Sequence, residues 1–291
     1  MKKIGWIGTW VMGHAMVQHI IDAGYEVYLW NRTKSKTADL VAKWATFCET
    51  IWELTQKSDI IFSIIWDPKN VENVYFWENN ILENISEWKT LVDMTTTKPS
   101  LAEKIYKEAK EKWVWSLDAP VSGGDIGAIN GTLSIMVWGN MEDFTAVSSL
   151  FWLMGKTITY TWEAGTWQHT KMANQISIAG NTIALCESLI YAEKSGLDLE
   201  KTIAVVSGWA AGNWWWNNLA PRILKDELDT CFFVKHFVKD MRIALEECQR
   251  MNIALPGLAL VHQLYTALVA QWDEDLWTQA LIKVLKKMNN M

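Results

Sequence analysis

Residues 3–31 read KIGWIGTWVMGHAMVQHIIDAGYEVYLWN, and this stretch decides the fold. The apolar run Lys3–Ile7 predicts a buried strand. The apolar spacing over Val11–Ala23 predicts a helix that ends at Gly24, and Tyr25–Trp30 predicts a second strand. A strand, a helix and a strand in so short a stretch are typical of a β-α-β unit, in which the two strands lie parallel in one sheet.

The turn between the first strand and the helix has the sequence Gly8-Thr9-Trp10-Val11-Met12-Gly13. It occupies the place of the dinucleotide-binding turn G-x-G-x-x-G, where backbone N–H groups and the positive end of the helix hold a pyrophosphate. Trp10 stands where the middle glycine lets the backbone approach the phosphate, so its indole is expected to obstruct that approach. The turn predicts a dinucleotide site, with an ordinary strand–turn–helix without ligand as the alternative.

The polar turn after the second strand bears on the choice of cofactor. Asn31 stands 23 residues past Gly8, where a carboxylate would bind the ribose hydroxyls of NAD and repel a 2′-phosphate. Asn31-Arg32-Thr33 contains no carboxylate, and the Arg32 guanidinium can pair with a phosphate through two donors. This turn therefore favours NADP(H), with NAD possible and a solvated turn arginine as the alternative.

The rest of the chain divides into two halves of different character. Further strands are predicted at 59–65, 90–93, 114–118, 133–137 and 157–160, with helices at 100–111 and 142–153. Later patterns are helical only, at 168–195, 199–206, 218–228, 236–250, 257–270 and 275–287. We therefore expect an α/β fold: a Rossmann-type doubly wound parallel sheet over residues 1–163, joined through a long helix to an all-helical domain over residues 164–291.

Composition and charge argue against several classes of protein. The chain has 291 residues, a formal net charge of −6 and no basic run, which argues against nucleic acid or an anionic membrane as the main partner. It contains no run of about 18 apolar residues, so no membrane span is expected. The cysteines stand far apart, as expected for reduced core thiols of a cytoplasmic protein without disulfides or a metal site; they are Cys48, Cys186, Cys231 and Cys248.

Tryptophan is unusually abundant and glycine is scarce, with 20 and 16 residues respectively. Trp44 and Trp113 each follow a predicted helix, where a left-handed residue commonly ends the helix and a β-carbon costs about 1–2 kcal/mol. Other tryptophans at positions expected to carry glycine or a small residue are Trp66, Trp138, Trp209, Trp272 and Trp277. So selective a pattern indicates an altered chain rather than neutral drift.

Two segments in the middle of the chain carry groups suited to substrate chemistry. In DAPVSGGDIGAINGTL (118–133), Ser122, Gly123 and Gly124 offer a hydroxyl and unshielded N–H groups, which suit a carboxylate; a flexible loop is the alternative. In GTWQHTKMAN (165–174), Lys171 and Asn174 lie three apart and share one face of the predicted helix. An ammonium and an amide so placed can protonate and orient a carbonyl oxygen, whereas a generic helical lysine is a solvated charge.

A third segment, FFVKHFVKD (232–240), lies in the helical half. Lys235 and Lys239 are one helical turn apart, and so are His236 and Asp240. One edge of this helix could therefore line a cleft, and surface ion pairing is the alternative.

Taken together, in this order and spacing, these segments resemble the β-hydroxyacid dehydrogenase family, which includes 3-hydroxyisobutyrate dehydrogenases and semialdehyde reductases. The resemblance covers nearly the whole chain. It implies a dinucleotide-binding Rossmann domain, a helical domain for substrate binding and oligomerisation, and a homodimer or homotetramer. The implied reaction is reversible hydride transfer between NADP(H) and a short β- or γ-hydroxy acid or aldehyde acid.

The resemblance also implies roles for single residues. Lys171 falls on the catalytic lysine, Thr96 on a threonine that contacts the cofactor, and Lys239 on the lysine beside the nicotinamide. The residues that fall on substrate-binding positions are Ser122, Gly123, Gly124, Asn174, Phe232 and Asp240. The sequence departs from the family at Trp10 and Trp167, which replace glycines. A non-catalytic dinucleotide-fold scaffold with a blocked cofactor turn is therefore the alternative function.

Overall fold

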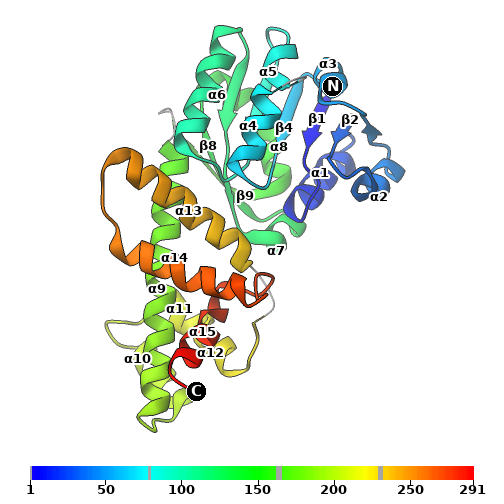
Figure 1. The fold of residues 1–291 in the computed structure, drawn as a ribbon. Coiled ribbons are helices and arrows are strands. Elements are labelled where there is room, and N and C mark those ends of the chain that lie inside the picture. Colours follow the sequence, from blue (N-terminus) through cyan, green and yellow to red (C-terminus); the bar gives the residue numbers. More distant parts are fainter. Residues whose placement is uncertain (1, 78–79, 162–165, 229–231) are drawn as a thin grey trace. The chain divides into compact units, whose positions relative to one another are not determined.

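The computed structural model describes residues 2–77, 80–161, 166–228 and 232–291 (Figure 1). The chain forms two compact units, Met1–Lys171 and Met172–Met291. The domain boundary expected at residues 163 and 164 lies outside the described residues, and so do Gly165 and Cys231.

The first unit is built on one sheet, as predicted. Its strands are β1 (Ile4–Ile7), β2 (Val27–Trp30), β3 (Thr46–Phe47), β4 (Ile60–Ser63), β5 (Thr90–Asp93), β6 (Trp115–Asp118), β7 (Val121–Ser122), β8 (Leu133–Trp138) and β9 (Gly155–Thr161). Their order is β3-β2-β1-β4-β5-β6-β8-β7, with β9 also paired to β8. Strands β1 to β6 run parallel, while β8 runs antiparallel to β6 and β7. The order reverses between β1 and β4, which is the topological switch point where such folds bind ligands.

Helices cover both faces of this sheet (Figure 1). They are α1 (Met12–Asp22), η1 (Lys34–Thr37), α2 (Ala38–Ala42), α3 (Ile51–Lys57), α4 (Pro68–Phe76), α5 (Ile81–Asn84), α6 (Pro99–Glu111), α7 (Gly124–Ile129) and α8 (Met141–Met154). Alternate residues of each strand enter separate cores, because successive side chains point to opposite faces. Phe62 packs in the core beneath α1, α7 and α8, and its neighbour Ile61 packs in the core beneath α3 to α6. The doubly wound α/β fold is thereby confirmed.

The second unit is helical. Helix α9 (Thr166–Lys194) begins in the first unit and continues into the second, followed by α10 (Leu199–Ser207), α11 (Trp214–Asn218), α12 (Ala220–Leu224), α13 (Val234–Met251), α14 (Pro256–Ala270), η2 (Thr278–Ala280) and α15 (Leu281–Met288). The rings of Phe237 on α13 and Tyr265 on α14 meet edge to face with centroids 5.1 Å apart, both fully buried. None of the helices in the described ranges is long and apolar enough to cross a membrane.

Two predicted helices differ from the structure. The helix expected over 218–228 is shorter in the structure, where α12 covers Ala220–Leu224 with Pro221 in its first turn, and Asn218 is the last residue of the separate helix α11. The helix expected over 275–287 starts later, because Trp277 is extended and forms an isolated bridge with Phe233.

Candidate active site

The cofactor turn has a backbone that only glycine can supply at two positions. Gly8 has a φ of +98°, and a β-carbon there would lie 2.1 Å from the carbonyl oxygen of Ile64. A β-carbon on Gly13 would lie 2.3 Å from the carbonyl oxygen of Gly8. The turn is therefore packed tightly against the end of β4 and the first turn of α1. Val11 caps α1 without a side-chain hydrogen bond, and Met12 begins the helix.

Asn31 ties together the loops that follow β1 and β2. Its Oδ1 accepts a hydrogen bond from the backbone N–H of Thr9 at 3.2 Å, and its Nδ2 donates to the carbonyl oxygen of Thr33 at 2.8 Å. Arg32 and Thr33 are exposed beside it. The structure thus brings the two expected cofactor segments, residues 8–13 and 31–33, to the same edge of the sheet.

Two tryptophans stand where the dinucleotide would enter. Trp10 follows β1 and Trp66 follows β4, and their rings meet edge to face with centroids 4.9 Å apart. The Nζ of Lys36 lies 5.6 Å from the centroid of the Trp10 ring. Because β1 and β4 flank the switch point, these indoles lie at the carboxyl ends of the strands between which a pyrophosphate would bind. The backbone of the turn therefore fits a dinucleotide, whereas these two side chains do not.

Trp167, the other departure from the family, is placed differently. Its Nε1 donates a hydrogen bond to the carbonyl oxygen of Val137 at 3.0 Å, which joins the start of α9 to β8. The indole that contacts Trp10 at the cofactor turn is therefore that of Trp66 and not that of Trp167.

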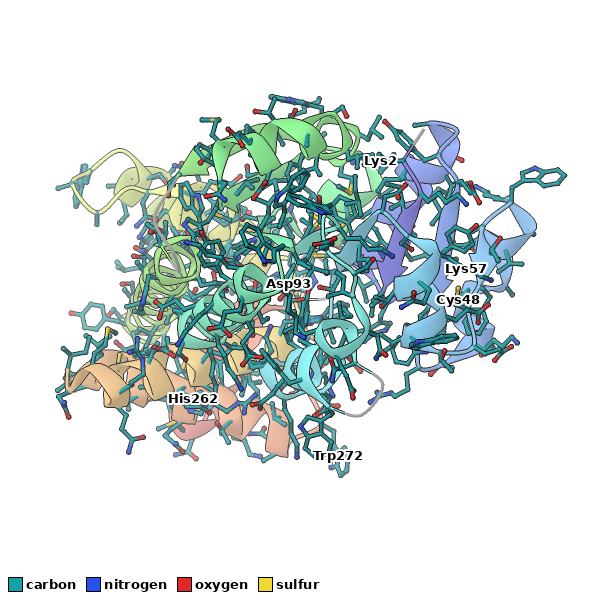
Figure 2. All side chains as sticks on the ribbon, turned by 90° about the horizontal axis from the view of Figure 1, so that it is seen from above. Lys2, Cys48, Lys57, Asp93, His262 and Trp272 are labelled. Atoms are coloured by element: carbon teal, nitrogen blue, oxygen red, sulfur yellow. The ribbon has the colours of Figure 1, made fainter. Side chains whose placement is uncertain are left out.

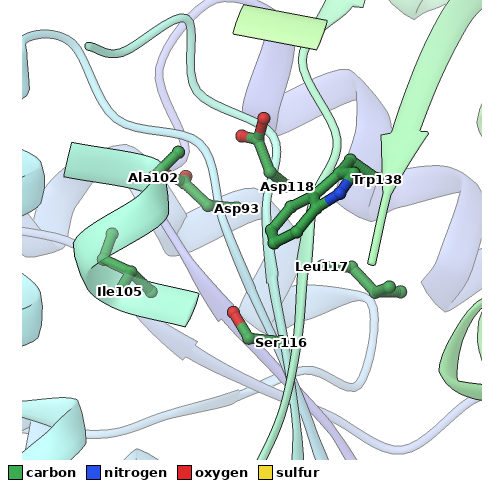
Figure 3. Close-up of a pocket in the computed structure, with 7 residues that line it drawn as sticks. All are labelled: Asp93, Ala102, Ile105, Ser116, Leu117, Asp118 and Trp138. Atoms are coloured by element: carbon green, nitrogen blue, oxygen red, sulfur yellow. The ribbon is translucent and has the colours of Figure 1, made fainter. Parts of the chain in front are cut away.

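Two buried carboxyl groups end the neighbouring strands β5 and β6. Asp93 accepts hydrogen bonds from the hydroxyls of Ser63 at 2.8 Å and Thr95 at 2.6 Å. Burial raises the pKa of Asp118 well above its usual range, and the negative charge of Asp93 raises it further, while a hydrogen bond from Gln168 acts in the opposite direction. Figure 3 shows both carboxyl groups in a small pocket beside α6; its lining residues are Asp93, Ala102, Ile105, Ser116, Leu117, Asp118 and Trp138.

Gln168, in the first turn of α9, holds three parts of the first unit together. Its Nε2 donates to the carbonyl oxygen of Thr95 at 2.8 Å and to Oδ1 of Asp118 at 2.8 Å. Its Oε1 accepts from the backbone N–H of Thr97 at 3.1 Å. The Gln168 side chain is fully buried, so its hydrogen bonds replace those that each of these groups would otherwise make to water. Thr96 lies between the two threonines that Gln168 contacts.

Lys171 lies one helical turn beyond Gln168. Its side chain is buried, with only 6% of the residue exposed, and its Nζ lies 3.5 Å from the carbonyl oxygen of Val121. Val121 immediately precedes Ser122, Gly123 and Gly124, and the two glycines have φ angles of +133° and +62°. The lysine predicted to be catalytic and the loop predicted to bind a carboxylate are therefore neighbours within the first unit.

The other predicted substrate and cofactor residues lie in the second unit. Lys239 and Asp240 on α13 are both buried, with Lys239 Nζ and Asp240 Oδ1 3.1 Å apart. The other Asp240 oxygen accepts a hydrogen bond from Nε2 of Gln175 at 2.7 Å. Asn174 donates to Oε1 of Gln175 at 2.9 Å. The ring of Phe232 lies 5.9 Å from that of Phe237.

Gln168 and Asp118 lie in two of the segments that the sequence singles out, but their roles were not predicted. A buried amide with three hydrogen bonds to two distant segments, Thr95–Thr97 and the end of β6, has no signature in the sequence, since its partners are 50 to 73 residues away along the chain. The burial of Gln168 in the structure is what reveals its role, because a fully buried glutamine is almost always hydrogen-bonded.

Several tryptophans predicted at glycine-like positions were tested by their backbone angles. Trp44, Trp113 and Trp272 have positive φ, which confirms the prediction for them. Trp138 and Trp277 have no left-handed backbone and are buried, so their backbone angles do not require glycine and the expectation of a small residue there stays a prediction. Trp138 packs against Tyr106 with ring centroids 4.5 Å apart.

The doubly wound sheet and the glycine turn at its switch point define an NAD(P)-dependent oxidoreductase. Residues 3–162 match the model of the NAD-binding domain of 6-phosphogluconate dehydrogenase, and residues 165–285 match that of the NAD-binding domain of NADP-dependent 3-hydroxyisobutyrate dehydrogenase. The chain belongs to this family of 3-hydroxyisobutyrate dehydrogenase-like hydroxyacid dehydrogenases.

Individual relatives agree with this assignment over nearly the full length. The chain is 46% identical to a probable 3-hydroxyisobutyrate dehydrogenase-like protein of Arabidopsis thaliana, covering 99% of this chain and 86% of that protein. It is 35% identical to 2-hydroxy-3-oxopropionate reductase of Escherichia coli, covering 99% and 98%. The fold matches that of 3-hydroxyisobutyrate dehydrogenase from Mycobacterium tuberculosis with a TM-score of 0.91 at 23% identity, over 98% and 99% of the two chains.

Proposed function

We propose that this protein is an NADP(H)-preferring reductase and dehydrogenase of short β- or γ-hydroxy acids, with Lys171 as its proton carrier. The observation that carries the proposal is the burial of Lys171 against the carbonyl of Val121, beside the loop Ser122–Gly124. A buried amine next to a concave run of N–H groups can serve both ends of a short hydroxy acid.

Each group has a separate task in this mechanism. A bound nicotinamide would exchange the hydride with the carbon that bears the hydroxyl. Lys171 Nζ takes the hydroxyl proton in oxidation and returns it to the carbonyl oxygen in reduction. The Ser122 hydroxyl and the N–H groups of Gly123 and Gly124 hold the carboxylate, which fixes the distance between that anchor and the reacting carbon.

The names of the relatives support the substrate class. 3-Hydroxyisobutyrate and 2-hydroxy-3-oxopropionate are short acids whose C3 bears a hydroxyl or a carbonyl oxygen. One carboxylate anchor and one proton carrier therefore suffice for both, and we propose the same arrangement for the substrate of this chain. Asn174, Phe232, Lys239 and Asp240 are proposed as the contribution of residues 164–291, and residues 1–163 are proposed as the cofactor domain.

The test is the oxidation of NADPH by short aldehyde acids, followed by absorbance. It is made on the chain as it stands and on the W10G/W66G variant, in which the crevice between β1 and β4 is cleared. We expect turnover in the variant and its loss on adding Lys171→Ala. If Lys171→Ala leaves the turnover unchanged, the proposed mechanism is contradicted.

Preference for NADP(H) is proposed from the turn after β2. Asn31 is hydrogen-bonded to Thr9 and Thr33, and the neighbouring Arg32 is exposed, so its guanidinium is free of the protein core and can pair with a 2′-phosphate through two donors. In the W10G/W66G background, Arg32→Ala is expected to weaken NADPH binding and to leave NADH binding unchanged, as measured by calorimetry. An equal loss of affinity for NADPH and NADH would contradict the proposed preference for NADP(H).

One observation favours the alternative, a scaffold without catalysis. The contact between Trp10 and Trp66 closes the place where the pyrophosphate would lie. If the chain as it stands binds neither cofactor and the W10G/W66G variant binds NADPH, the turn is intact and only these side chains block it. If neither protein binds a dinucleotide, the scaffold function is supported.

A further inference from the structure

Helix ends in this protein follow one geometric pattern. In a Schellman motif, the residue after the C-cap is left-handed and donates to the carbonyl three residues before it, and the next residue donates to the carbonyl five before itself. Glycine holds this left-handed position at Gly24, Gly131 and Gly196. Asparagine or aspartate holds it at Asp226, Asn252 and Asn290. These are the residue types that tolerate a positive φ.

Tryptophan holds the same position at Trp44, Trp113 and Trp272, with φ angles of 77°, 56° and 64°. After α2, the N–H of Trp44 donates to Val41 at 3.1 Å and that of Ala45 donates to Leu40 at 3.2 Å. After α6 and α14 the equivalent pairs of bonds measure 3.2 and 3.0 Å, and 3.0 and 3.1 Å. The backbone is therefore the one built by Gly24, Gly131 and Gly196.

The indoles at these positions bury too little surface to offset the strain. Trp44, Trp113 and Trp272 are 94%, 68% and 90% exposed, and Figure 2 shows the Trp272 side chain projecting away from the ribbon. By contrast, Trp6 is fully buried and stacks on Phe62 with ring centroids 5.4 Å apart. A large apolar side chain that is both strained and solvated adds no burial to offset its cost.

Two further tryptophans stand at positions that favour glycine, Trp88 because of its backbone and Trp10 because of its place in the cofactor turn. Trp88 has a φ of 67° and is exposed, and its ring lies near that of Trp113, with ring centroids 6.3 Å apart. Trp10 stands in the cofactor turn between Gly8 and Gly13, where its indole meets Trp66 instead of leaving the backbone open. Unfavourable tryptophans thus recur at unrelated places, each with a backbone or a ligand site that requires glycine.

We propose that Trp10, Trp44, Trp88, Trp113 and Trp272 are glycine in the protein made by its own cell, because one of the codons written here as tryptophan is decoded there as glycine, whereas another codon still specifies tryptophan. The fold then has glycine at each of these left-handed positions and at the second position of the cofactor turn. Buried tryptophans such as Trp6 keep their identity, since a glycine there would leave a large cavity.

The decisive measurement is the peptide mass spectrum of the protein isolated from its source organism. We expect peptides that contain residues 44, 113 and 272 to be lighter by the difference between tryptophan and glycine, and the peptide that contains residue 6 to have its tryptophan mass. Tryptophan masses at positions 44, 113 and 272 would overturn the proposal. The result does not depend on enzymatic activity, so it is distinct from the test of the proposed function.

A second measurement uses the recombinant chain. Trp44→Gly, Trp113→Gly and Trp272→Gly are each expected to raise the equilibrium constant for folding by about fivefold. The matched control Trp6→Phe is expected to lower it, because it removes buried contacts. Destabilisation by all three glycine substitutions would show that these indoles belong to the fold and would overturn the proposal.

Discussion

Lys171 is proposed to transfer the proton through its Nζ atom. Its Nζ is buried near the carbonyl of Val121, in the part of the first unit that also holds Ser122–Gly124. In the W10G/W66G background, Lys171→Ala is expected to lower kcat by about 10²- to 10⁴-fold, which is the usual share of a general acid or base. Lys171→Arg is expected not to restore it, because a guanidinium does not release its proton near neutral pH.

The matched control for this prediction is Lys194→Ala, at the exposed other end of α9. Initial rates with NADPH and an aldehyde acid should be the same as in the background protein. If Lys194→Ala and Lys171→Ala lower kcat equally, the loss reflects damage to the helix, and the assignment of Lys171 as proton carrier fails.

His236 is one residue through which acid is expected to act on the second unit. Burial and then the positive charge of Lys239 lower the pKa of His236 from 6.5 to about 4. Between these two values the unfolded chain binds the proton and the folded chain does not, so this residue reduces stability as the pH falls from about 6.5 to 4. Above that window its effect is constant.

The prediction is checked by urea unfolding at pH 7 and pH 4.5 in the chain and in His236→Gln. The variant should lose less stability between the two pH values than the unchanged chain. Asp143, whose pKa burial raises to about 6, acts in the opposite direction and is present in both proteins, so the difference isolates His236. An identical loss in both proteins would contradict the prediction.

At the scale of elements, Gln168 holds the start of α9 through its hydrogen bonds to Thr95, Thr97 and Asp118. Gln168→Ala leaves Thr97 N–H and the Thr95 carbonyl without their partner, and is expected to destabilise the protein by about 1–3 kcal/mol per unsatisfied group. Because Lys171 lies one turn further on, kcat is expected to fall more than KM rises.

Ser188→Ala, on the exposed face of the same helix, is the control and should change neither quantity. Gln168→Glu keeps the acceptor for Thr97 but places a second carboxyl beside Asp118, so it should not rescue kcat. Full activity of Gln168→Ala would show that α9 is positioned by other contacts.

Much of the element order could be predicted from the sequence, because the strands are apolar runs with polar residues at their ends. Residues 90–93 were predicted as a strand and are β5. Strands β3 and β7 were not predicted, because two residues are too few to show a periodic pattern. The Gln168 contacts and the meeting of Trp10 with Trp66 could not be predicted, since both depend on where separate loops arrive in space.

The candidate site was predictable in its segments and not in its contacts. The spacing of Gly8 and Gly13 indicated a tight turn, and the reason became visible only with the carbonyl oxygens of Ile64 and Gly8 in place. Similarly, the left-handed backbone at Trp44 and Trp113 was expected from the helix ends that precede them, whereas Trp138 proved to be a buried strand residue.

At the scale of the whole molecule, resemblance to the family predicts self-association. We expect the protein in solution to have two or four times the mass of one chain, as a homodimer or homotetramer. Light scattering after size-exclusion chromatography measures this directly at several loading concentrations. A mass of one chain at every concentration would contradict the expectation.

The central claim is that this chain transfers a hydride to a short aldehyde acid with Lys171 supplying the proton. The most direct test is to give the W10G/W66G variant NADPH labelled with deuterium at the transferable position of nicotinamide C4 and to analyse the product by mass spectrometry. We predict a hydroxy acid with deuterium on the carbon that was the carbonyl, formed about 10²- to 10⁴-fold more slowly with Lys171→Ala. A variant that binds NADPH but forms no labelled hydroxy acid, or labelling at an equal rate in Lys171→Ala, would contradict it.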